Sequence, residues 1–249
     1  MVAIILAAGY ATRLYPMTKY MPKALLCIGG KPMLDYIVDK TYEIPSISKI
    51  AVVSNGKFYG HFVEWKKSRE NCYAGRQKEL LVLNDGTLSE ETRLGAIGDI
   101  QFAIDELHID DDLLIIAGDN FFTFSLLDFH NFHIAKGTDC VVVKKLFDRE
   151  MLKNVGVATI STDNRVLVFE EKPKEPKSDY AVYASYIYMR ETLPLFKQYL
   201  DEGNPNDAPG HFPAWLCKIN PVFAYEFDGE CYDIGTHEAY GEICRKYKI

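Results

Sequence analysis

The amino-acid sequence predicts an α/β protein whose sheet is Rossmann-like, mixed but mostly parallel, and flanked by helices. Three observations support this fold class. Apolar runs of strand length alternate with segments of helical periodicity through the first 145 residues. These runs are apolar at nearly every position, as expected of parallel strands buried on both faces. From about Gly156 onward, short strand-like segments follow one another closely, which indicates an added antiparallel region.

The parallel part of the predicted sheet comes from the first 145 residues. Its apolar runs are predicted strands, at residues 2–8, 50–54, 80–83, 113–117 and 140–143. Segments of helical period separate them, at residues 33–42, 58–67, 94–107 and 126–136. Because strands alternate with helices, we expect right-handed βαβ crossovers and a doubly wound sheet.

The remaining residues predict a different arrangement. Three strand-like segments at 155–160, 166–169 and 181–189 are separated by turn residues, which favours antiparallel pairing beside the parallel sheet. Residues 203–210 contain two prolines and two asparagines and are predicted to form a loop. Residues 236–248 are predicted to form a terminal helix capped by Thr236.

Composition excludes several classes of protein. The formal net charge is 28 − 35 = −7, which argues against a nucleic-acid partner, although a locally basic pocket can still hold a phosphorylated ligand. No apolar run approaches the roughly 20 residues that span a membrane, so no membrane partner is expected. The amino terminus lacks a basic leader, so we expect a cytoplasmic protein. The six cysteines form no C-x-x-C pair, so neither a zinc site nor a redox motif is expected.

His130 and His133 have the i, i+3 spacing of a metal-binding pair but no third metal ligand nearby. Both histidines are therefore expected at a surface or interface.

The loop after the first strand is the first candidate binding site. In a doubly wound sheet, ligands bind outside the carboxyl ends of the strands. The segment 6–16 contains neither a Walker A sequence nor G-x-G-x-x-G. It offers small residues that let backbone N–H groups approach an anion, and Arg13 and Lys23 can neutralise phosphate charge. A tight turn with solvated cations is the alternative.

An ordered set of motifs resembles the sugar-1-phosphate nucleotidyltransferases, also called sugar-nucleotide pyrophosphorylases. Their amino-terminal pattern, L-A-G/A-G-x-G-T-R-L-x-P-x-T, then P-K and G-x-K-P-M/L, is matched by residues 6–18, 22–23 and 30–33. Later motifs of the family are matched in order, at residues 118–120, 156–157, 170–173, 181–182 and 233–236. The resemblance therefore covers nearly the whole chain. Ala11 and Ala184 depart from it, because each stands where the family usually has glycine.

The resemblance implies a single nucleotidyltransferase domain over residues 1–249. Residues 1–145 would be its nucleotide-binding core, and residues 146–249 its sugar-phosphate-binding part. Its substrates would be a nucleoside triphosphate and a sugar 1-phosphate. Because two polyanions must meet, the site needs cations and a metal. The sequence leaves a homo-oligomer open.

The catalytic residues implied are Arg13, Lys23 and Lys172. Arg13 is suited to the leaving β- and γ-phosphates, Lys23 to the α-phosphate or the leaving oxygen, and Lys172 to the sugar phosphate. Asp119 and Asp233 each follow a strand-like run beside small residues, and both are expected to bind one Mg²⁺, a hard ion that takes carboxylate and phosphate oxygens. Taken alone, each aspartate is also ordinary turn or N-cap chemistry.

The same resemblance implies the substrate-binding residues. The residues expected to contact nucleotide or sugar are Leu6, Ala8, Gly9, Thr12, Asn84, Gly95, Gly118, Gly156, Glu171 and Val182. Glu171 would contact sugar hydroxyls. Asn84 stands where thymidylyltransferases place a glutamine against the pyrimidine, and it offers the same amide donor and acceptor. A pyrimidine is expected, but thymine, uracil and cytosine are not distinguished.

The expected activity is magnesium-dependent nucleotidyl transfer to a sugar 1-phosphate, with release of pyrophosphate, in nucleotide-sugar and polysaccharide biosynthesis. dTTP and glucose 1-phosphate are the favoured substrates. Cytidylyl or uridylyl transfer to another sugar phosphate or to phosphocholine is the nearest alternative. A non-catalytic regulatory relative is an alternative of another class, but such a protein is expected to lose the cations and carboxylates that are present here. A dinucleotide-dependent oxidoreductase is disfavoured because the glycine fingerprint is missing.

Overall fold

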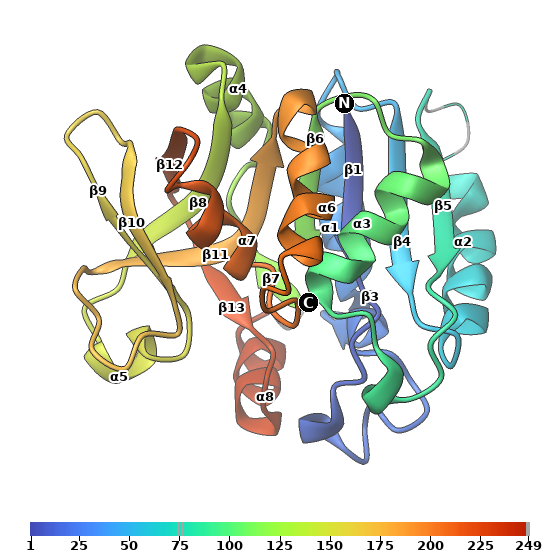
Figure 1. Ribbon diagram of the computed structural model, residues 1–249. Coiled ribbons are helices and arrows are strands. Elements are labelled where there is room, and N and C mark those ends of the chain that lie inside the picture. Colours follow the sequence, from blue (N-terminus) through green and yellow to red (C-terminus); the bar gives the residue numbers. More distant parts are fainter. Residues whose placement is uncertain (74, 76, 248–249) are drawn as a thin grey trace.

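The computed structural model describes residues 1–73, 75 and 77–247, and a nine-stranded sheet lies at its centre (Figure 1). The parallel half of the sheet consists, in spatial order, of β6 (Leu113–Ala117), β1 (Val2–Leu6), β4 (Lys49–Ser54) and β5 (Glu79–Asn84). β6 is buried throughout, and so is β1 apart from its last residue. The predicted parallel strands at 2–8, 50–54, 80–83 and 113–117 are therefore confirmed.

The antiparallel half joins the sheet at β6. The long strand β11 (Tyr180–Tyr188) runs antiparallel to β6 and continues into pairing with β8 (Asp139–Lys145) and β9 (Gly156–Ile160). β9 pairs in turn with β10 (Val166–Glu171), and Figure 1 shows this hairpin at the opposite end of the sheet from β5. The mixed, mostly parallel sheet with added antiparallel strands agrees with the predicted fold class.

Two features of this half differ from the prediction. The run at 140–143 was expected among the parallel strands of the doubly wound sheet. It lies in β8, which is antiparallel to β11 and parallel only to β12 (Val222–Glu226). The sequence reasoning missed β12. It also missed four short strands elsewhere, because strands of two or three residues carry no periodicity: β2 (Cys27–Ile28), β3 (Lys31–Pro32), β7 (Asn120–Phe122) and β13 (Cys231–Asp233).

The helices largely follow the predicted segments. Two agree with their predicted bounds, α1 (Met33–Tyr42) and α4 (Leu126–Lys136). α2 runs longer than predicted (Tyr59–Tyr73), and α3 begins late (Ala96–Leu107) because its N-cap, Gly95, has φ 78°. Three were not predicted, α5 (Arg149–Leu152), α6 (Pro194–Asp201) and α7 (His211–Leu216). In α8 (His237–Lys246) Thr236 accepts a hydrogen bond from the N–H of Ala239, so the predicted cap is confirmed, while Lys248 lies outside the described residues.

The helices cover both faces of the sheet. Ala3 and Ile5 of β1 point to one face, where they belong to the same apolar cluster as residues of α1, α2 and α4. Val2 and Ile4 point to the other face, where α3, α6 and α7 supply the apolar partners. This alternation along one buried strand is what packs two helical layers against a single sheet. None of the helices in the described residues has the length and apolarity to cross a membrane.

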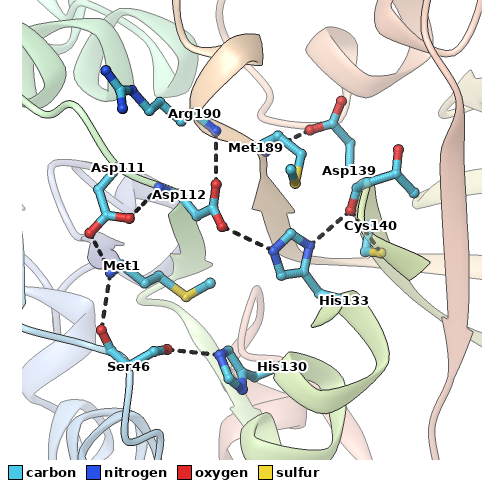
Figure 2. A network of polar contacts seen from close by, with 11 residues as sticks. Met1, Ser46, Asp111, Asp112, His130, His133, Asp139, Cys140, Met189 and Arg190 are labelled. Atoms are coloured by element: carbon cyan, nitrogen blue, oxygen red, sulfur yellow. Dashed lines mark hydrogen bonds and ion pairs between the residues drawn. The ribbon is translucent and has the colours of Figure 1, made fainter. Parts of the chain in front are cut away.

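A polar network with a buried centre lies at the end of the sheet where β1 and β6 begin (Figure 2). His133 lies at its centre: its Nδ1 is 2.8 Å from the Thr138 carbonyl oxygen, and its Nε2 is 3.4 Å from an Asp112 oxygen. Nearby, the Asp139 carboxyl accepts hydrogen bonds from the N–H of Met189 (2.7 Å) and from the Thr192 hydroxyl (2.8 Å). The expectation that His130 and His133 lie at a surface or interface is wrong, since both are buried within the chain. Their α4 positions look polar in sequence, yet they face this network.

Asp139 gives this network a pH-dependent contribution to stability. Burial raises the pKa of Asp139 to about 6, above the value of about 3.9 expected in the unfolded chain. A raised carboxyl pKa means that the folded state holds the proton more tightly. The stabilising contribution of Asp139 is therefore complete below about pH 4 and is lost as the pH rises through about 6.

We predict that Asp139→Ala lowers the free energy of unfolding by about 3 kcal/mol at pH 4.5 and by only about 1 kcal/mol at pH 7. The substitution leaves buried donors unpaired, but at pH 7 it also removes a buried charge. Urea unfolding at both pH values measures the difference. Asp201→Ala is the control, because Asp201 forms an exposed ion pair with Lys197, so its loss is expected to cost at most about 0.5 kcal/mol at either pH. A penalty for Asp139→Ala that did not change with pH would contradict the assignment.

Candidate active site

Two adjoining cavities lie at the carboxyl ends of β1 and β6. The larger has a volume of about 440 Å³ and the smaller about 180 Å³. Most predicted site residues line the larger one: Leu6, Ala8, Gly9, Thr12, Arg13, Lys23, Gly95, Gly118, Asp119, Lys172 and Asp233. Gly156, Glu171 and Val182 line the smaller one, and Asp119, Lys172 and Asp233 face both. The structure thus brings together every predicted site residue except Asn84.

Lys23 lines the larger cavity and pairs with two carboxylates. Its Nζ donates hydrogen bonds to Asp119 Oδ2 at 2.9 Å and to Asp233 Oδ1 at 3.2 Å. The lysine lies in the short helix η2 (Lys23–Leu25) and is buried, whereas both carboxylates are open to the cavity side. β13 pairs with β7 so that Asp233 lies opposite Asn120, next to Asp119. This short antiparallel pair is therefore what joins carboxylates 114 residues apart in the chain (233 − 119).

The donor set at this position fits a hard divalent cation bound together with a substrate. Two carboxylates converge at one point, and neither is enclosed: the exposed fractions of their side chains are 49 % for Asp119 and 63 % for Asp233. The described residues contain no cluster of three or more His, Cys, Asp or Glu side chains that could bind a metal without a substrate. Mg²⁺ is commonly held by one or two carboxylates and completed by phosphate oxygens and water. Asp119 and Asp233 suit that kind of site.

The loop after β1 takes its shape from a left-handed residue. Ala11 has φ 47° and ψ 43°, and its carbonyl accepts hydrogen bonds from the N–H of Leu14 (3.0 Å) and the hydroxyl of Thr18 (2.7 Å). Glycine adopts this conformation more easily than alanine. Ala11, which stands where the family usually has glycine, therefore keeps the left-handed turn at the cost of backbone strain. The turn leaves Arg13 exposed on the cavity wall, and within the described chain no carboxylate pairs with it.

The smaller cavity is built around Glu171. Burial raises the pKa of Glu171, and nearby Lys172 and His211 oppose that rise. Gly210 packs so tightly that a Cβ there would lie 1.9 Å from Glu171 Oε2, so a side chain at 210 would displace the carboxyl. Lys172 has φ 48°, a strained conformation of the kind found at functional sites. Ala184, the second departure from the family pattern, also lines this cavity.

Asn84 lies outside both cavities. It ends the edge strand β5, and its Oδ1 accepts a hydrogen bond from the N–H of Gly86 at 2.9 Å. The wall near the predicted contact Gly95 is instead completed by residues that the sequence reasoning did not select: Tyr10, Glu90, Arg93, Ala96, Asp99, Asp207, Ala208 and Pro209. Asp99 lies four residues before Ala103, which is buried, and residues four apart share one face of a helix. That spacing indicates that Asp99 faces inward.

Comparison with known proteins identifies the relatives of this chain. The model of the nucleotidyl transferase family matches residues 2–248. The chain is 25 % identical to a glucose-1-phosphate adenylyltransferase of Fervidobacterium nodosum, covering 97 % of this chain and 60 % of that protein. It is 27 % identical to a Sulfolobus acidocaldarius protein named for mannose-1-phosphate guanyltransferase, covering 97 % and 61 %. The chain therefore spans about 60 % of the length of these relatives.

Solved structures confirm the fold. A Bacillus anthracis protein named for glucose-1-phosphate thymidylyltransferase superposes with a TM-score of 0.82 at 24 % identity, covering 100 % of this chain and 96 % of that one. A UDP-glucose pyrophosphorylase complexed with UDP-glucose gives 0.81 at 20 % identity, covering 99 % and 97 %. At these identities the likeness establishes the α/β architecture with its mixed sheet.

We predict that Ala11→Gly stabilises the protein by about 0.5 kcal/mol, because relief of the left-handed strain outweighs the extra freedom of glycine in the unfolded chain. Thermal and chemical unfolding measure the change. Ala135→Gly is the matched control: Ala135 is exposed in α4, so the same substitution is expected to destabilise, by up to about 1 kcal/mol. Destabilisation by both substitutions would show that the turn does not strain Ala11.

Proposed function

The chain belongs to the nucleotidyl transferase family, and from this premise we propose that it transfers a nucleotidyl group from a nucleoside triphosphate to a sugar 1-phosphate and releases pyrophosphate. The observation that carries the proposal is the pair of adjoining cavities with Asp119, Lys172 and Asp233 at their junction. Two phosphorylated substrates placed side by side would meet there. dTTP and glucose 1-phosphate are the substrates we favour.

The reaction is an in-line displacement. A phosphate oxygen of the acceptor attacks the α-phosphorus of the triphosphate, the bond to the bridging oxygen breaks, and pyrophosphate leaves with that electron pair. The acceptor phosphate is ionised at neutral pH, so no general base and no covalent nucleophile are required. Catalysis then rests on positioning and on neutralising charge.

The basic residues of the larger cavity divide this work. Exposed Arg13 would bind the β- and γ-phosphates, for which a guanidinium fork is well suited. Lys23, fixed between two carboxylates, would stabilise charge at the α-phosphate. Lys172, which faces both cavities, would hold the phosphate of the acceptor against the nucleotide.

Asp119 and Asp233 would hold Mg²⁺. When bound there, the ion supplies a positive charge that offsets the negative charge on the phosphate oxygens during transfer. Lys23 neutralises part of the carboxylate charge and keeps both groups aimed at the same point.

The smaller cavity would receive the sugar. Glu171 is its buried carboxyl and would accept hydrogen bonds from sugar hydroxyls, while the backbone at Gly156 and Val182 would complete the contacts. Relatives are named for adenylyl and guanylyl transfer, and a structural neighbour for UDP-glucose. Cytidylyl or uridylyl transfer to another sugar phosphate or to phosphocholine therefore remains the second candidate, and a non-catalytic regulatory protein the third.

A pyrophosphate-release screen tests the proposal. ATP, CTP, GTP, UTP and dTTP are each paired with glucose 1-phosphate, mannose 1-phosphate and phosphocholine in the presence of Mg²⁺. We expect turnover with a sugar 1-phosphate, and most rapidly with dTTP and glucose 1-phosphate. Absence of turnover with every pair would favour the regulatory alternative.

We predict that Asp119→Asn and Asp233→Asn each lower the rate of pyrophosphate release by at least about 100-fold. Each substitution removes one negative ligand and keeps the shape of the side chain, and Lys23 retains the other carboxylate as its ion-pair partner. The variants are therefore expected to fold, with a lowered unfolding temperature because the buried ammonium loses one of its two charged partners. Asp163→Asn, in the exposed turn between β9 and β10 and outside both cavities, is the matched control and should retain full activity. Unchanged turnover in either variant would refute the metal-binding role of that residue.

A further inference from the structure

Asp99 is an acidic residue in the wall of a cavity that we assign to a polyanion. It lies in the first turn of α3, beside Gly95 and Ala96, and all three line the larger cavity. Only 6 % of its surface is exposed. Its Oδ1 has no hydrogen-bond partner among the described residues. The phosphate chemistry proposed above gives this carboxyl no role.

A second carboxyl, that of Asp85, lies near enough to Asp99 to affect its pKa. The Asp85 oxygens accept hydrogen bonds from the N–H (2.7 Å) and the hydroxyl (3.1 Å) of Thr87. Neighbouring carboxyl groups disfavour ionisation of both at once. Burial, together with Asp85, raises the pKa of Asp99 to about 8. Asp99 is therefore the neutral partner at pH 7.

Polar and charged groups lie on one side of Asp99, and apolar groups lie on the other. Tyr10, from the loop after β1, reaches Thr87 through its hydroxyl at 3.3 Å. Glu90 and Arg93 line the same cavity and form an ion pair with each other at 3.5 Å, and Glu91 lies beside them in the helix η3 (Glu90–Thr92). The elements packed against α3 contribute apolar side chains to its buried side, among them those of Ile4 from β1, Val53 from β4 and Phe196 from α6.

Small residues line the cavity near Asp99 and leave room for a base. Ala8, Gly9, Gly95 and Ala96 are all small, and Gly95 cannot gain a side chain, because a Cβ there would lie 2.5 Å from the Asn206 carbonyl oxygen. An ionised carboxylate at this place would repel a triphosphate. A neutral carboxyl does not, and it offers both a donor and an acceptor to a hydrogen-bonding edge.

We propose that Asp99 reads the nucleobase, using its carboxyl in the cavity wall to hydrogen-bond the base edge. The proposal rests on the proposed function, since it takes the larger cavity as the nucleotide site. The base must present an N–H group to the unpartnered oxygen, as the imino group of thymine, uracil or guanine and the amino group of cytosine or adenine can. Asp85 lines neither cavity and contacts no substrate in this scheme.

Direct binding tests the proposal without any acceptor substrate. Isothermal titration of ATP, CTP, GTP, UTP and dTTP, in the presence of Mg²⁺, is compared with titration of inorganic tripolyphosphate, which has the phosphates but no base. For Asp99→Ala we expect about fivefold weaker binding of the preferred nucleotide, from loss of a hydrogen bond. Binding of tripolyphosphate should stay within about twofold, because its contacts are unchanged.

The Asp99→Asn variant tests whether ionisation of Asp99, rather than a change in packing, alters nucleotide affinity. The amide has the shape of the carboxyl and an acceptor oxygen but cannot ionise, so at pH 7 we expect nucleotide affinity within about twofold of the unmodified protein. Between pH 7 and pH 9 the affinity of the unmodified protein should fall by about tenfold as Asp99 ionises. The Asp99→Asn variant should lack that fall.

Four results would overturn the proposal. Normal nucleotide binding by the unmodified protein with unchanged affinity in Asp99→Ala would refute this inference alone. Weakening of tripolyphosphate binding as much as binding of the preferred nucleotide would indicate a purely structural role, and an equal loss for all five nucleotides would indicate a contact with the ribose. If the unmodified protein bound no nucleotide at all, the proposed function would fail together with this inference.

Discussion

The buried ammonium of Lys23 is the constraint on which the site depends. A charge taken out of water must be paired, and its two partners come from Asp119, after β6, and from Asp233, 210 residues further along the chain than Lys23. β13 must therefore return across the molecule to pair with β7. The cavity beside the loop after β1 is therefore completed by residues from the last third of the chain.

This arrangement explains how an acidic protein can offer a site to polyanions. Lys23, Asp119 and Asp233 together carry a charge of 1 − 2 = −1, which suits a divalent cation. Arg13 and Lys172 line the same cavity and bring the sum to 3 − 2 = +1, while Glu90, Arg93 and Asp207 add 1 − 2 = −1, so with Asp99 neutral the charged lining sums to 0. A bound divalent cation would bring the sum to +2, so the field that would attract a triphosphate is local and depends little on the net charge of −7.

The sequence predicted those elements whose residues show a local pattern of apolar side chains. Buried parallel strands appear as continuous apolar runs, so β1, β4 and β6 and the loops that follow them were identified, and with them Arg13 and Asp119. β7 and β13 are defined only by their pairing partners, so three-residue segments gave no signal. His133 and Asp99 are polar residues on helices whose inward orientation is decided by tertiary packing, and the sequence shows their type but not the polar partner that each one meets.

The two cavities are linked by one short stretch of backbone, residues 206–210. At one end the Asn206 carbonyl accepts the N–H of Ile97, and its side-chain amide donates to the Leu94 carbonyl, which docks the stretch onto the start of α3. At the other end Gly210 lies against Glu171. A side chain at Gly95 would strike Asn206, and one at Gly210 would strike Glu171. Glycine at both positions therefore fixes the spacing between the Asp99 wall and the Glu171 carboxyl, and with it the distance across which two bound substrates would face each other.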